Sequence, residues 1–161
     1  MLLSLAALPF AARAGAPGPG MPVESGHLAL EALFFRQPGT RAEPAALAGP
    51  PGPVLGPLVG GLRRAGFGVV GQLSTTLQIA AGATGVARLE ELLPGSGLSG
   101  RLSVTRSQIL VVHLDAHCAE CAGSADIDER RRVKFGERHY FDSPLIGAII
   151  ALNPAPDLAP G

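Results

Sequence analysis

The stretch from Glu129 to Pro154, ERRRVKFGERHYFDSPLIGAIIALNP, determines how the rest of this sequence is interpreted. It begins with a basic run, turns at Asp142-Ser143-Pro144 and ends in the apolar run Leu145 to Leu152. We predict two hydrogen-bonded strands joined by a polar connection. The second run is apolar at odd and even positions alike, which is typical of an interior strand with both faces covered.

Apolar and charged residues alternate through the first of these strands. Ile127, Val133 and Phe135 fall on one side, because successive side chains of a strand point to opposite faces. The charged residues that fall on the other side are Asp128, Arg130, Arg132 and Lys134. The pattern predicts a cationic stripe on one face of a sheet.

Eleven residues of this stretch carry a family resemblance. They are Arg131, Arg132, Gly136, Glu137, His139, Tyr140, Phe141, Asp142, Pro144, Leu145 and Gly147. With them the stretch resembles the C-terminal signature of the CsiV-type peptidoglycan-binding proteins of Gram-negative bacteria. Ala29 to Gln37 resembles the N-terminal strand of that family, and Ile109 to Asp115 its penultimate strand. The family's Trp-containing strand has no Trp here, and Arg138 and Ser143 replace an apolar residue and a histidine.

The resemblance implies a function in the periplasm. Members of this family bind peptidoglycan without catalysing a reaction, and they assist a class A penicillin-binding protein together with its outer-membrane lipoprotein activator. We therefore expect a non-catalytic accessory protein of cell-wall synthesis that has no cofactor.

The composition restricts the function further. The chain has 161 residues, enough for one domain with a core, and 47% of them are hydrophobic. Lys plus Arg and Asp plus Glu are equal at 13 each, so no global charge favours nucleic acid or a membrane surface. The sequence contains no Gly-x-Ser-x-Gly, His-Glu-x-x-His, Walker or dinucleotide-binding motif, which argues against an enzyme.

The N-terminal residues have the pattern of an export signal. Residues 1–14 hold a short apolar segment followed by Ala12-Arg13-Ala14, a small-x-small cleavage pattern, although a basic n-region is missing. The alternative is an Ala-rich leader of a cytosolic protein. We expect a flexible lead-in at 15–26, a Pro-rich tail at 155–161 and no apolar run that spans a bilayer.

Between these ends we expect one α+β domain over residues 27–154. It should contain a mostly antiparallel sheet of about four or five strands, with one or two helices packed on one face. The first half should hold a half-buried strand at His27 to Phe35, a Pro/Gly-rich loop at 37–53 and a short helix from Leu55 that ends at Gly66. A β-leaning segment at Leu73 to Ile79 and a helix at Ala83 to Leu93 should follow. We then expect a hairpin at Leu98 to Ala116 that turns at Ser107-Gln108.

The two cysteines leave three interpretations open. Cys118 and Cys121 could form a disulfide, act as a redox pair, or bind a metal ion together with His113 and His117. Against the redox role, the motif follows a strand and does not open a helix. A metal-binding or thiol-redox protein is therefore one alternative function, and a protein-interaction module that does not bind glycan is another.

The basic run is the main candidate for ligand binding, because arginine donates two parallel hydrogen bonds to a carboxylate. The alternative is that nearby carboxylates neutralise it, namely those of Asp126, Asp128, Glu129 and Glu137. Tyr140 could stack on a sugar or simply pack, and Asp142 could accept backbone amides in its turn. The candidate ligand-binding residues are Arg130, Arg131, Arg132, Lys134, His139, Tyr140 and Asp142.

Overall fold

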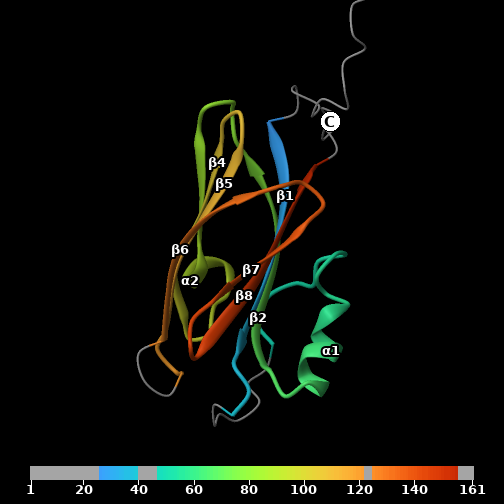
Figure 1. The fold of residues 1–161 in the computed structure, drawn as a ribbon, viewed down its shortest axis with the longest axis vertical. Helices are drawn as coiled ribbons and strands as arrows, with labels where there is room; N and C mark the ends of the chain where they lie inside the picture. The colour runs from blue at the N-terminus through green and yellow to red at the C-terminus, as the bar shows by residue number, and fades with distance from the viewer. Residues whose placement is uncertain (1–25, 40–46, 122–124, 156–161) are drawn as a thin grey trace, which may run out of the picture.

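The computed structural model describes residues 26–39, 47–121 and 125–155, which form eight strands and two helices (Figure 1). The expected export signal at 1–14, nearly all of the lead-in at 15–26 and of the tail at 155–161, and the centre of the 37–53 loop lie outside these residues.

The strands form two antiparallel sheets of four strands each. The first sheet has the order β2 (Gly68–Gln78), β1 (His27–Arg36), β8 (Ile146–Pro154) and β7 (Arg138–Asp142). The second has the order β3 (Thr84–Arg88), β4 (Leu98–Arg106), β5 (Leu110–Cys118) and β6 (Ala125–Val133).

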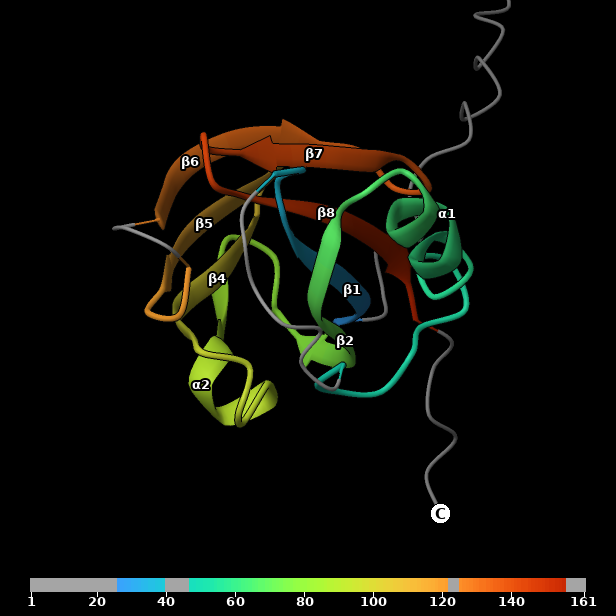
Figure 2. The same cartoon turned by 90° about the horizontal axis from the view of Figure 1, so that it is seen from below.

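The two sheets enclose one apolar core. Viewed from below, β4, β5 and β6 lie on one side of the interior and β1, β2 and β8 on the other (Figure 2). Alternate residues of each strand point inward, as Leu102 and Val104 do on β4 and Val112 and Leu114 on β5, and all four are fully buried. This alternation is the usual result of packing two sheets face to face.

Helix α1 (Leu58–Arg64) covers the outer face of the first sheet (Figures 1 and 2). A second, smaller core lies beneath it, in which Leu33 and Phe35 of β1 are buried. The helix ends as expected at Gly66, whose φ of 88° allows the Phe67 amide to donate to the Leu62 carbonyl at 3.0 Å.

Strand β1 is confirmed, but the expectation that it is half-buried is wrong. It lies between β2 and β8, with one face in the main core and the other beneath α1 and the 47–55 segment. Glu31 is buried in this strand and accepts hydrogen bonds from the amides of Val54 and Leu55, the second at 2.8 Å.

The expected helix at Ala83 to Leu93 is wrong over its first half. Thr84–Arg88 is strand β3, paired with β4, and only Leu89–Leu92 forms a single helical turn, α2. Long-range pairing overrides local helical spacing here. The Glu90 carboxylate joins α2 to β4 by accepting the Gly100 amide at 3.0 Å; its own amide and that of Gly100 hold its pKa below the usual value.

The organisation of the Glu129 to Pro154 stretch also differs from expectation. Its two long strands do not pair with each other: β6 pairs with β5, while β8 pairs with β1 and β7. A third strand, β7, occupies the region expected to be a connection. The interior position of β8 is confirmed, with β1 on one side and β7 on the other.

The mostly antiparallel character is confirmed, as is the hairpin of β4 and β5. A single sheet of four or five strands is replaced by two sheets, and the two helices are short.

Candidate functional site

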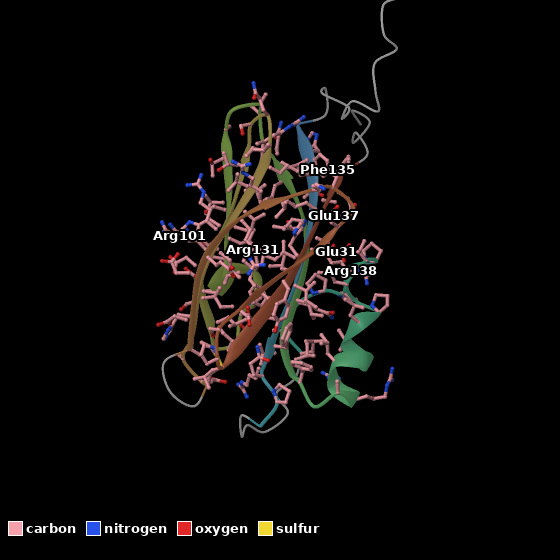
Figure 3. The ribbon with its side chains drawn as sticks, in the orientation of Figure 1. Glu31, Arg101, Arg131, Phe135, Glu137 and Arg138 are labelled. Carbon is pink, nitrogen blue, oxygen red and sulfur yellow. A yellow bond between two sulfur atoms is a disulfide. The ribbon has the colours of Figure 1, made fainter. Side chains whose placement is uncertain are left out.

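A pocket of about 460 Å³ lies at the end of the second sheet, where the β4–β5 turn meets the connection from β6 to β7. Figure 3 labels Phe135 and Glu137 in that connection. The residues that line the pocket are Gln108, Ile109, Leu110, Arg132, Val133, Lys134, Phe135, Glu137 and His139. It therefore brings together three of the predicted ligand-binding residues, Arg132, Lys134 and His139.

Strand register places the two walls of this pocket side by side. Leu110, the first residue of β5, pairs with Val133, the last residue of β6. The turn that carries Ile109 is held by Ser107, whose hydroxyl donates to the Ile109 carbonyl at 2.9 Å. Ile109 itself stays 43% exposed at the pocket edge.

The opposite wall is held by two hydrogen bonds. The Gly136 amide donates to the Leu152 carbonyl of β8 at 3.0 Å, and the Lys134 amide donates to Nε2 of His139 at 3.1 Å. His139 therefore fixes the connection, and its Nε2 is already occupied.

The basic run is divided between two environments. Arg130 and Arg132 lie on the exposed face of β6, as the alternation predicts, and no carboxylate in the described part of the chain pairs with either. Arg131 points to the other face of the strand and stays 42% exposed, but it pairs with Glu129, and its guanidinium carbon lies 5.4 Å from the centre of the Phe141 ring. Arg131 is therefore engaged within the fold.

Lys134 contributes a second cation to the pocket. Its ammonium lies 3.7 Å from a Glu137 carboxylate oxygen, and both side chains are largely exposed, at 80% and 52%. Exposed pairs of this kind contribute little energy, so Lys134 can exchange Glu137 for a ligand carboxylate.

Tyr140 and Asp142 lie on the outer face of β7, away from the face that carries His139. The Tyr140 ring stacks on Phe35 with centroids 5.8 Å apart, and its hydroxyl accepts from the Gln37 amide nitrogen at 3.1 Å. Ser143, and not Asp142, holds the following turn through its amide and hydroxyl contacts with Ile146. These two candidates line a separate, shallow depression with Pro144.

Cys118 and Cys121 form a disulfide in the structure. The nearby histidines each contact an aspartate on β6: His113 lies 2.7 Å from Asp128, and His117 contacts Asp126. Within residues 26–39, 47–121 and 125–155, no group of three His, Cys, Asp or Glu residues is arranged to hold a metal ion. A site built on the two sulfurs would need the disulfide to be reduced.

Sequence reasoning missed Ile109 and Glu137 as pocket residues and used Phe135 only to define a strand face. A partial signal was present for Ile109, because alternation places it on the same strand face as the polar His113 and Asp115.

Neither helix of the described residues has the length and apolar character needed to cross a bilayer. Comparison with protein-family models, curated proteins and solved structures gives no match.

Proposed function

We propose that this protein binds peptidoglycan in the periplasm without catalysing a reaction, and supports wall synthesis by a class A penicillin-binding protein with its outer-membrane lipoprotein activator. The observation that carries the proposal is the pair Arg130 and Arg132 on the exposed face of β6. In the described part of the chain neither guanidinium is neutralised by a carboxylate.

The chemistry of the polymer matches this surface. Peptidoglycan presents peptide carboxylates along its length, and a guanidinium binds a carboxylate through two parallel hydrogen bonds. Since the whole chain has a formal net charge of +0, attraction to an acidic polymer must come from a local surface of this kind.

The Cys118–Cys121 disulfide agrees with the proposed location. Disulfides persist in oxidising compartments such as the bacterial periplasm and are rare in the cytosol. This argument is independent of the basic residues.

Co-sedimentation with purified sacculi tests the proposal. Wild type should pellet at low salt, and the double variant Arg130→Glu and Arg132→Glu should stay in the supernatant. A matched control, Arg63→Glu and Arg64→Glu, makes the same charge change on exposed residues of α1 and should pellet like wild type. Arg131 is left intact because Glu129 and Phe141 engage it within the fold.

Two results contradict the proposal in different ways. If wild type remains in the supernatant with sacculi at low salt, peptidoglycan binding is excluded. A protein-interaction module is then the better interpretation. Equal loss of binding in both double variants shows that overall charge, and not the β6 surface, governs the interaction.

A further inference from the structure

We infer that the pocket between the β4–β5 turn and the β6–β7 connection binds the end of a peptide that has a free carboxylate beside a small apolar side chain. This inference depends on the proposed function and names its substrate class, because the stem peptides of peptidoglycan end in D-alanine. The pocket has two halves of different chemistry, and the ligand end must match both.

The apolar half is formed by Ile109, Leu110, Val133 and Phe135. Leu110 and Val133 are buried, at 4% and 6% exposure, while Ile109 at 43% is one of the most exposed large apolar residues of the described chain. A methyl group placed against Ile109 and Phe135 removes apolar surface of both partners from water.

The charged half is the rim formed by Arg132, Lys134 and Glu137, where two cations outnumber one carboxylate. Arg132 has no carboxylate partner in the part of the chain that the structure describes, and Lys134 has only its exposed contact with Glu137 at 3.7 Å. A ligand carboxylate at this rim accepts charge-assisted hydrogen bonds from Arg132 without displacing a partner. A neutral amide in the same place gains much less binding free energy, because its hydrogen bond is not strengthened by charge on both partners.

The pocket is formed before a ligand arrives. Ser107 fixes the turn that carries Ile109, while the Lys134 and Gly136 amides fix the other wall through His139 and Leu152. Binding to a surface that is already ordered loses little conformational entropy. The volume of about 460 Å³ lies within the range of small-molecule sites, about 300–1,000 Å³, and suits a chain end more than a folded partner.

The test is an NMR titration of the ¹⁵N-labelled full chain with three probes. N-acetyl-D-alanyl-D-alanine carries the free carboxylate, its C-terminal amide lacks the charge, and N-acetylglycylglycine lacks the methyl groups. We expect the first probe to shift the amide signals of Ile109, Lys134 and Gly136. The amide should bind at least about ten-fold more weakly, because a charge-assisted hydrogen bond is lost, and the glycine probe should also bind more weakly.

Matched variants connect the affinity to the pocket. Arg132→Gln should weaken binding of the acid at least about ten-fold and reduce its preference over the amide. Ile109→Ser should weaken the acid and the amide by the same factor, because it removes apolar contact only. Arg64→Gln on α1 should leave both affinities unchanged, and unaltered signals from β1 and β8 show that each variant is folded.

Three results overturn the inference: equal binding of acid and amide, shifted signals confined to other surfaces, or no shift with any probe. If the protein binds sacculi but no dipeptide, this pocket is not the binding site, and the proposed function is not contradicted. Dipeptide binding without sacculus binding supports the ligand class and removes peptidoglycan as its source.

Discussion

At the scale of single residues, the most informative side chain outside the pocket is Glu31. Its carboxylate is buried at 4% exposure in the middle of β1, a position where an uncompensated charge is costly. It accepts the Leu55 amide at 2.8 Å and the Val54 amide at 3.0 Å, so it satisfies two donors of the segment that leads into α1. One acidic residue thus connects the sheet to the helix that covers it.

We predict that Glu31→Gln lowers the free energy of unfolding by about 2 kcal/mol. The amide keeps the shape of the side chain, but it presents one acceptor and turns a donor toward the Val54 and Leu55 amides. Chemical denaturation followed by circular dichroism measures the change. The control is Glu91→Gln on α2, whose exposed carboxylate lies 3.8 Å from Arg88 and should change stability by less than about 0.5 kcal/mol. Similar losses in both variants would show that the buried hydrogen bonds have no special role.

At the scale of elements, the sequence is informative wherever alternation and burial agree. Strands β4 and β5 are visible in the sequence because inward apolar residues alternate with outward polar ones, and β8 because its apolar run has both faces covered. Strand β3 is hidden because Val86, Leu89 and Leu93 also have helical spacing, and only pairing with β4 distinguishes the two. Alternation does not identify the strand with which another strand pairs. For this reason the prediction that β6 and β8 hydrogen-bond to each other is wrong.

In the candidate site too, some features follow from local alternation and others depend on long-range strand pairing. The cationic stripe of Arg130 and Arg132 follows from alternation, so the sequence predicts it. The apolar wall does not follow, because Ile109 approaches Phe135 only when Leu110 pairs with Val133. The packing of Arg131 on Phe141 depends equally on the approach of two different sheets.

A glycine position in β4 gives a test of this register. Gly100 pairs with Ala116 and has a φ of 118°, and a Cβ atom there would lie 2.1 Å from the Asp115 carbonyl oxygen. We predict that Gly100→Ala lowers the free energy of unfolding by at least about 2 kcal/mol, from strain and displaced strand pairing. Thermal unfolding measures the change.

The matched control is Gly61→Ala in α1. Apart from its chain neighbours and the backbone of its own helix, no described atom lies within 4 Å of a Cβ placed there, and the backbone is helical. The substitution should raise the free energy of unfolding by about 0.5–1 kcal/mol, since alanine loses less backbone entropy in a helix. If Gly100→Ala were as well tolerated as this control, the β4–β5 register described above would be wrong.

At the scale of the whole molecule, positive and negative residues are equal in number but unevenly distributed over the surface. The chain carries 13 basic and 13 acidic residues, and several of the pairs lie on the second sheet, such as Arg101 with Asp115 and His113 with Asp128. Along β6 the exposed face changes from Asp126 and Asp128 at one end to Arg130 and Arg132 at the other. The molecule therefore has a local cationic surface near the pocket. Because its net charge is zero, it exerts little long-range attraction on an acidic polymer.

This arrangement predicts how salt affects binding to sacculi. The screening length falls from about 10 Å at 0.1 M salt to about 3 Å at 1 M, so contacts between exposed charges weaken steeply over this range. We expect the pelleted fraction of wild type to fall by at least about half between these concentrations. The Arg130→Glu and Arg132→Glu variant should bind weakly at both. Full retention of wild type at 1 M salt would mean that the polymer is held by sugar or apolar contacts, and the guanidinium groups of β6 would then have no part in recognition.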